Sequence, residues 1–198
     1  INTHHHNRII IAVEGIYSMS GDLLNREIFD VADRYNALLI VDEAHSVGVV
    51  GENLRGVFDL FGITPKDNHI KMGTLGKALG SYGAYILCSH HIAEFLQNRA
   101  KAIIYTTAPS LFDIALGYQG LLFILKHREK LKAEIKARQA IVQKSLGMNI
   151  EGLICSYPLK EDSNALSVQQ HLIDEGFLVC SIRPPTVPKP ILRLISRL

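Results

Sequence analysis

Short apolar runs alternate with amphipathic stretches in the first part of the chain. Ile9 to Val13 is a continuous apolar run, which predicts a strand buried on both faces. Leu23 to Tyr35 carries apolar residues at helical spacing with one polar face, and Ala37 to Val41 is a second apolar run. A strand, a helix and a strand of these lengths predict a βαβ unit, which builds a parallel sheet.

Further apolar runs extend the predicted sheet. Ile70 to Thr74 and Ala84 to Cys88 are predicted strands, and a helix is predicted from His90 to Arg99. Ile103 to Pro109 ends in a proline, which indicates a strand end followed by a turn. The alternative is that its two adjacent hydroxyls, Thr106 and Thr107, are a pair of donors for an anion.

A long helical pattern follows and divides the chain. From Ser110 to Leu146 we predict a helix in two pieces broken near His127, the first strongly apolar and buried, the second with alternating charge. Gly147 is its expected C-cap. We therefore expect residues 1–125 to form part of a large domain with a mostly parallel α/β sheet, and residues 126–198 to form a small α+β domain.

The small domain has its own order of predicted elements. Strands are predicted from Leu153 to Tyr157 and from Phe177 to Ile182, on either side of a helix from Ser167 to Glu175. Arg183 to Pro188 contains three prolines and predicts a rigid turn, after which Ile191 to Leu198 is a last strand.

Composition narrows the class of protein. The chain is 47% apolar and 20% charged, which is typical of a globular domain, and its net charge of +2 is too small to indicate nucleic-acid binding. We expect no membrane span, because no apolar run is long enough. Cys88, Cys155 and Cys180 form neither a metal pattern nor a disulfide framework, so we expect a reducing, cytoplasmic location. The tract at 4–6 is three histidines without other ligands nearby, so we expect a loop and no metal.

Polar side chains follow two of the predicted strands. Ser18 lies in the loop after the first strand, while Asp42 and His45 follow the second strand directly. Ligands of open parallel sheets bind at the carboxyl ends of the strands. A carboxylate at that position is partly desolvated and needs a cationic or donor partner. Asp42 and His45 are therefore site candidates. For Ser18 a simple turn-forming role remains equally open.

The stretch from Lys71 to Tyr85 carries the most distinctive pattern. One lysine, Lys77, lies among four glycines, Gly73, Gly76, Gly80 and Gly83, and among apolar residues. We expect this lysine to be held and desolvated, with Thr74 facing the same space. A phosphate-binding P-loop would need glycine in place of Lys71 and Ser or Thr in place of Ala78, and is therefore excluded.

These pieces match what pyridoxal phosphate requires. A desolvated lysine can form a Schiff base with a carbonyl cofactor, and a carboxylate can pair with the ring nitrogen. Further donors must serve the ring oxygen and the phosphate. The chain offers Lys77, Asp42, Ser18 with His45, and Thr74 for these positions.

Three segments carry a resemblance to a known family. Residues 42–53, 73–80 and 14–22 resemble the α-oxoamine synthases, pyridoxal-phosphate enzymes of the aspartate-aminotransferase fold (fold type I). These enzymes condense an amino acid with an acyl-CoA and release carbon dioxide. The turn at 182–188 resembles the branch that uses L-alanine with pimeloyl-CoA or the pimeloyl-carrier-protein thioester. A glycine-acetylating member, a simple aminotransferase of the same fold and a non-catalytic paralogue remain alternatives.

The resemblance also implies residue roles. Lys77 is the Schiff-base lysine, Asp42 pairs with the pyridinium nitrogen, Ser18 and His45 contact the ring hydroxyl side, and Thr74 lies near the phosphate. In further positions, Thr106 and Thr107 match a segment that reaches the cofactor phosphate of a neighbouring subunit. This implies a homodimer with its active site at the subunit interface. Thr186 matches a substrate-side position.

Two departures from the family pattern stand out. The family usually has Arg-apolar-Arg in the last strand, whereas this chain has Arg193 followed by Ile195. Arg193 is therefore the first candidate for the substrate carboxylate, with Arg197 and Arg183 as alternatives. The family's N-terminal half is also absent, so we expect a fragment that binds cofactor weakly and shows no turnover by itself.

Overall fold

The computed structural model describes residues 7–160 and 164–196 as two compact units. The first unit contains the described residues up to Ile16 together with Leu24–Leu131, and the second contains Tyr17–Leu23 and the described residues from Lys132 onwards. Each unit is described by itself below.

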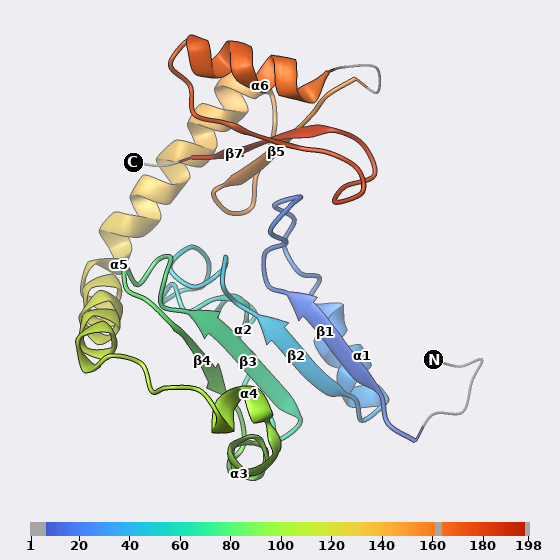
Figure 1. Ribbon diagram of the computed structural model, residues 1–198, viewed down its shortest axis with the longest axis vertical. Coiled ribbons are helices and arrows are strands. Elements are labelled where there is room, and N and C mark those ends of the chain that lie inside the picture. The colour runs from blue at the N-terminus through green and yellow to red at the C-terminus, as the bar shows by residue number, and fades with distance from the viewer. Residues whose placement is uncertain (1–6, 161–163, 197–198) are drawn as a thin grey trace. The chain divides into compact units, whose positions relative to one another are not determined.

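A four-stranded sheet organises the first unit (Figure 1). Its order is β1 (Ile10–Glu14), β2 (Leu38–Asp42), β3 (His69–Thr74) and β4 (Ala84–Leu87). β1, β2 and β3 are parallel, and β4 is antiparallel to β3. α1 (Glu27–Arg34) joins β1 to β2. The predicted βαβ unit and the mostly parallel sheet are therefore confirmed.

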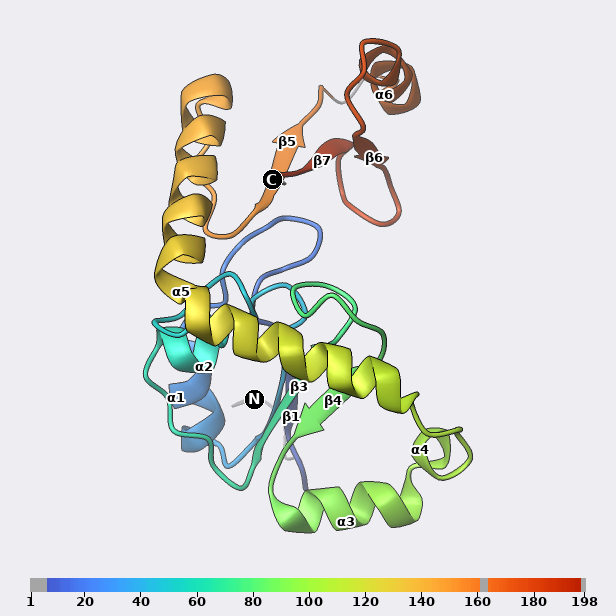
Figure 2. The same cartoon turned by 90° about the vertical axis from the view of Figure 1, so that its left-hand side faces the viewer.

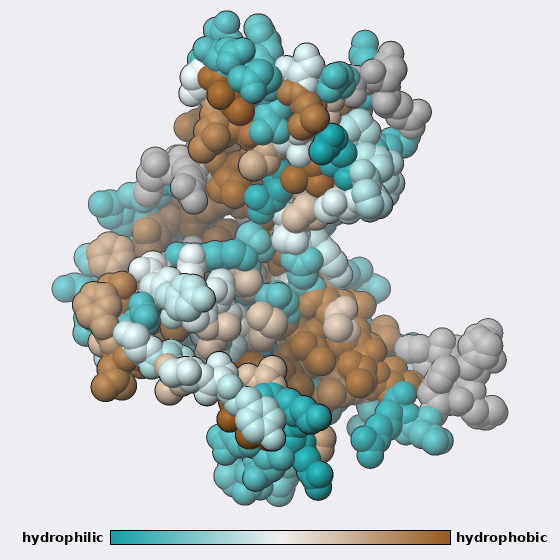
Figure 3. All heavy atoms as spheres, in the orientation of Figure 1, coloured by the Kyte–Doolittle hydropathy of each residue, from teal (hydrophilic) through white to brown (hydrophobic). Residues whose placement is uncertain are grey.

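One face of the sheet carries the core of this unit. Leu39 and Val41 of β2 are fully buried, and Phe29 of α1 packs edge-on against Phe58 of the short α2 (Val57–Leu60), with ring centroids 5.0 Å apart. β1 differs from the prediction, because Ile10 is 61% exposed. β1 is an edge strand of the described sheet. Figure 3 shows a hydrophobic region of the surface over β1 and β2.

Helices follow β4. α3 (His90–Arg99) has the predicted bounds, but the predicted strand end after Ile103 is wrong, because α4 (Lys101–Ile104) is a helical turn. α5 (Leu111–Leu146) is the long helix, and the non-helical backbone of His127 (φ −109°, ψ 16°) confirms the predicted break (Figure 2). Its first piece is not buried as predicted, since Leu111 is 87% exposed. None of the described helices is long and apolar enough to cross a membrane.

The second unit is a small α+β structure. β5 (Ile154–Pro158), β6 (Cys180–Ile182) and β7 (Ile191–Ile195) form an antiparallel sheet in the order β5-β7-β6. α6 (Ala165–Asp174) lies against β6 and β7. The predicted strands are present, although β6 begins three residues later than expected.

Glycines end α5 and α6 as predicted. Gly147 (φ +67°) donates to the carbonyl of Gln143 at 2.9 Å after α5, and Gly176 (φ +89°) follows α6. A left-handed residue is the usual way to satisfy the last carbonyls of a helix.

Candidate functional site

The carboxyl ends of β2 and β3 bring the first site candidates together. The parallel register pairs Asp42 with Met72, so Asp42 lies beside the strand that leads into the lysine segment. The amide of Ala44 donates to one oxygen of the half-buried Asp42 carboxylate at 2.8 Å. The predicted common location of the acid and the lysine segment therefore follows from the register of two strands.

The lysine segment is a closed loop between β3 and β4. The amide of Leu75 donates to Gly83 at 2.8 Å, and that of Ser81 donates back to Leu75 at 2.8 Å. The hydroxyl of Thr74 donates to the Gly83 carbonyl at 3.1 Å and accepts the amide of Gly76 at 3.0 Å. Gly83 has a φ of +118°, which a side chain would strain. The glycine-rich sequence thus folds into a rigid frame for Lys77.

Helix α5 holds this loop from one side. The ideal Cβ positions of Gly117 and Gly120 point at Leu75 and at the backbone of Leu79, respectively. The hydroxyl of Ser81 also donates to the carbonyl of Asp113 at 2.6 Å. Two glycines three residues apart on a helix let its backbone approach a neighbour closely.

Lys77 itself is exposed in this chain, so its predicted desolvation is wrong for the described residues. The apolar residues of the loop face α5 instead, as shown by Leu79, which is only 6% exposed. The lysine amine lies 2.8 Å from Nε2 of His45, which is half-buried. Two of the predicted site residues, separated along the chain, are thus in direct contact.

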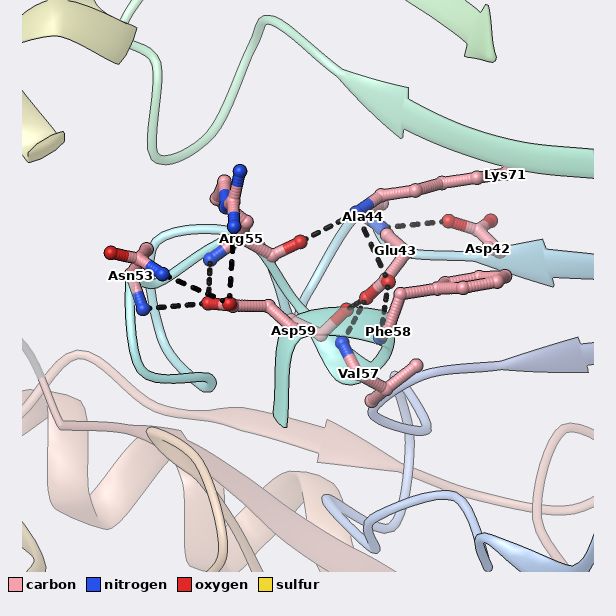
Figure 4. Close-up of polar contacts among 10 residues, drawn as sticks. Asp42, Glu43, Ala44, Asn53, Arg55, Val57, Phe58, Asp59 and Lys71 are labelled. Atoms are coloured by element: carbon pink, nitrogen blue, oxygen red, sulfur yellow. Dashed lines mark hydrogen bonds and ion pairs between the residues drawn. The ribbon is translucent and has the colours of Figure 1, made fainter. Parts of the chain in front are cut away.

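Glu43 is the residue of this site that sequence reasoning missed. It lies between Asp42 and His45 in the sequence and is fully buried. Its carboxylate accepts hydrogen bonds from the hydroxyl of Ser46 and from the amides of Val57 and Phe58 (Figure 4). The only signals in the sequence are the acidic residue after a strand and the nearby glycines, which left it indistinguishable from a solvated Glu.

Two other groups near the site have shifted pKa values. Burial raises the pKa of Tyr85, and the negative charge of Glu43 raises it further. Burial alone would raise the pKa of Asp59, but hydrogen bonds from Asn53 and Arg55 and the charge of Arg55 outweigh it, so the pKa is lowered. Asp59 is therefore a permanent acceptor that closes the loop 53–59, as Figure 4 shows.

The second unit holds the remaining candidates. Nε of Arg193 donates to the carbonyl of Ser18 at 2.6 Å. This hydrogen bond joins the loop that contains Ser18 to Arg193, the predicted anchor of the substrate carboxylate. Thr186 is exposed in the turn before β7, and Arg183 is exposed in the same turn. Arg197 lies outside the described residues.

Thr106 and Thr107 lie on an exposed segment. The chain between α4 and α5 is solvent-exposed throughout, and the hydroxyl of Thr106 makes a long contact of 3.5 Å with the carbonyl of Thr107. These two threonines stay predictions of a site shared with another subunit.

A cavity of about 260 Å³ lies away from Lys77 in the first unit. His69, Lys71 and Cys88 are among its lining residues. Among the described residues there is no group of His, Cys, Asp and Glu side chains that could hold a metal ion. The predicted histidine tract at 4–6 lies outside the described residues.

Comparisons with known proteins agree with the predicted resemblance. An 8-amino-7-oxononanoate synthase of Helicobacter pylori is 43% identical over 185 residues, which are 93% of this chain and 50% of that protein. The chain therefore spans about half the length of the curated relatives it matches.

Solved structures are similar over nearly the whole chain. An 8-amino-7-oxononanoate synthase from Francisella tularensis superposes with a TM-score of 0.74 at 30% identity, covering 95% of this chain and 57% of that one. A structure of SPT with a PLP internal aldimine superposes with a TM-score of 0.80 at 27% identity, covering 94% of this chain and 49% of that one. These likenesses confirm the expected fold type I.

The match to a family model covers almost every residue. The model for aminotransferase class I and II matches residues 1–195. This span includes all the site candidates except Arg197. The chain therefore belongs to the aminotransferase class I and II family.

Proposed function

We propose that this chain is the lysine-bearing part of a pyridoxal-phosphate-dependent α-oxoamine synthase. The whole protein would condense L-alanine with pimeloyl-CoA, or with the pimeloyl-carrier-protein thioester, to 8-amino-7-oxononanoate in biotin synthesis. The observation that carries this proposal is the 2.8 Å contact between Lys77 and His45 at the edge where Asp42 ends β2. The 43% identical relative supports the choice of substrates.

The donor set fits the proposed cofactor. A primary amine, an imidazole and a carboxylate are collected on two neighbouring strand ends, which is the chemistry that pyridoxal phosphate requires. Lys77 would hold the cofactor through its amine, and Asp42 would accept a hydrogen bond from the protonated ring nitrogen. His45 and Ser18 would serve the ring hydroxyl, and Thr74 the phosphate.

The residues of this chain would move a proton at the substrate. Bound pyridoxal phosphate supplies an electron sink for the α carbon of the amino acid. The imidazole nitrogen of His45 lies 2.8 Å from the Lys77 amine and would orient that amine through a hydrogen bond. Lys77 would then take and return the proton at the α carbon.

Arg193 is our proposed anchor for the substrate carboxylate. Its Nε donates to the Ser18 carbonyl at 2.6 Å, which restrains the guanidinium. Thr186 would line the substrate side. Arg183 in the exposed turn is the alternative anchor.

A second copy of the protein is the proposed partner. Apolar side chains are exposed from α4 to the start of α5, including Tyr105 (81%) in the connecting segment and Leu111 (87%) and Phe112 (74%) in α5. An apolar surface of this kind on a folded protein is typical of an interface. Thr106 and Thr107 lie within it, and we propose that they serve a phosphate site shared between the subunits of a homodimer.

We also propose the domain roles predicted above. Residues 1–125 would belong to the cofactor-binding large domain and residues 126–198 to the small domain. We propose a cytoplasmic location, which suits the three cysteines because all of them are free thiols in the described chain.

The test is the visible absorbance of the full-length protein mixed with pyridoxal phosphate. We expect a band that Lys77→Ala abolishes, while Lys101→Ala, an exposed lysine of α4, leaves it unchanged. A band that survives Lys77→Ala would refute the assignment of Lys77.

Release of CoA distinguishes the alternatives. We expect it with L-alanine and pimeloyl-CoA, rather than with glycine and acetyl-CoA, which a glycine C-acetyltransferase would prefer. A simple aminotransferase would release no CoA with either pair, and a non-catalytic paralogue would show no cofactor band.

A further inference from the structure

Glu43 is a buried carboxylate with a complete set of partners. It has no exposed surface, and it accepts the amides of Val57 at 2.9 Å and Phe58 at 3.4 Å as well as the hydroxyl of Ser46. Its charge faces Nζ of Lys71 at 3.3 Å. An ionised carboxylate is costly to bury unless it is paired and hydrogen-bonded, so each of these contacts is needed.

Lys71 is committed to the same cluster. Its side chain is 14% exposed, and its amine also donates to the carbonyl of Arg55 at 2.5 Å, as Figure 4 shows. Lys71 is part of β3, four residues before the lysine loop begins at Leu75. The ion pair therefore links β3 to the turn that follows β2.

The backbone of this turn is fixed to the same strand. The amide of Glu43 donates to Met72 of β3 at 2.8 Å, and the amides of Ser46 and Val47 donate to the Glu43 carbonyl at 3.1 and 3.0 Å. His45 lies at the tip of the turn. Glu43 thus ties the turn to β3 through both its backbone and its side chain.

Packing around the carboxylate is equally close. A Cβ at Gly56 would overlap the Glu43 carboxylate, and a Cβ at Gly15 would lie 2.9 Å from Glu43 Oε2 and 2.7 Å from Ser46 Oγ. Glycine at both positions therefore leaves the space that the Glu43 carboxylate occupies.

We propose that Glu43, through Lys71 and Ser46, is a positioning residue that holds the imidazole of His45 against the amine of Lys77. Both partners of the 2.8 Å contact then derive their position from β3, Lys77 through the loop that continues the strand and His45 through Glu43. This inference deepens the proposed function and rests on it for its catalytic meaning, although the contact is measurable without cofactor.

The test measures how strongly His45 affects the reactivity of Lys77. The full-length, cofactor-free protein is labelled with trace amine reagent at one fixed pH, and the rate at Lys77 is followed by mass spectrometry. We expect His45→Gln to change this rate by about tenfold in the wild-type background. In the Glu43→Gln background, the same substitution is expected to change it by less than about twofold.

Asp59→Asn is the matched control. Asp59 is the other carboxylate of this region, accepts amides of Asn53 and Arg55, and does not touch the turn at 42–47. In that background the effect of His45→Gln should stay near tenfold. Glu43→Gln removes a buried charge and could disturb folding, so Ser46→Ala provides a milder second variant. In that background we expect the effect of His45→Gln on the Lys77 labelling rate to be partly lost.

The outcomes separate the two proposals. A tenfold effect that persists in both the Glu43→Gln and Ser46→Ala backgrounds overturns the positioning role, and so does an equal loss in Asp59→Asn. The labelling needs neither pyridoxal phosphate nor substrate, so its result does not depend on the absorbance test of Lys77. If the cofactor band is present but the effect of His45→Gln on Lys77 labelling does not depend on Glu43, the proposed function stands and only the role of Glu43 is refuted.

Discussion

Position 120 of α5 tests whether the lysine loop depends on a bare helix backbone. A Cβ at Gly120 would overlap the carbonyl oxygen of Leu79 and lie 3.0 Å from its carbonyl carbon and 3.1 Å from its Cα. These are backbone atoms of a loop closed by its own hydrogen bonds, so they cannot rotate aside. Gly120→Ala must therefore displace either the loop or the helix.

Two opposing contributions decide the sign of the effect. Alanine is better than glycine in a helix interior by about 1 kcal/mol, whereas overpacking a tight site costs about 1–3 kcal/mol. We expect Gly120→Ala to lower the free energy of unfolding by about 1 kcal/mol, because the clash is with backbone. At Gly117 the nearest atom is a methyl of Leu75 at 3.1 Å, which can move. Gly117→Ala should therefore leave stability unchanged or raise it by up to about 1 kcal/mol.

Urea unfolding of the full-length protein, followed by circular dichroism, measures both variants. The pair is matched, because both substitutions add one methyl group to the same face of one helix, three residues apart. Trace labelling of Lys77 in the same samples reports whether the loop has moved. Equal gains in stability for Gly117→Ala and Gly120→Ala would refute the close approach of helix and loop.

Two further predictions concern charged groups outside the lysine loop. His69 is 3% exposed, and burial lowers its pKa below 6.5, although the charge of Asp33 opposes the shift. Protonation of His69 therefore favours the unfolded chain. Its effect on the free energy of unfolding is absent above pH 6.5, and the free energy falls as the pH drops from 6.5 through the folded pKa. Urea unfolding measured between pH 7.5 and 5 should show that His69→Leu loses less unfolding free energy than the wild type over this pH range. The exposed control His91→Gln should behave as the wild type. In the second unit, Arg193→Met removes the donor to the carbonyl of Ser18, a hydrogen bond of about 1.5–3 kcal/mol for a charged donor before allowance for partial exposure. Amide exchange at 17–23 should accelerate in Arg193→Met and stay unchanged in Arg183→Met, and equal exchange in both variants would contradict the contact.

The spacing of apolar residues along the chain predicted most of the strands and helices, because each has a characteristic period that is visible in the sequence itself. The break at His127 and the C-cap at Gly147 were also readable, since both depend on local residues. Burial was not, because it depends on what covers a side chain. Leu111 and Phe112 are apolar and helical as predicted, yet the described chain leaves both exposed.

The site shows the same division between local and distant causes. The glycines around Lys77 predicted a tight loop, but not which side of it packs, and Leu79 rather than Lys77 faces α5. The contact with His45 requires the register of β2 and β3, which residue spacing alone does not supply. Glu43 was missed because its burial is created by residues from distant segments, among them Gly56 and Lys71.

The packing of Glu43 also restricts the order in which this sequence can change. The backbone of Gly15 does not need a left-handed φ, so alanine is conformationally permitted there. What excludes it is the hydroxyl of Ser46 and the carboxylate of Glu43. Gly15→Ala is therefore harmful in the present background and becomes tolerable only after one of those side chains has shortened. We therefore expect Gly15, Glu43 and Ser46 to be coupled, so that the effect of a substitution at one position depends on the side chains at the other two.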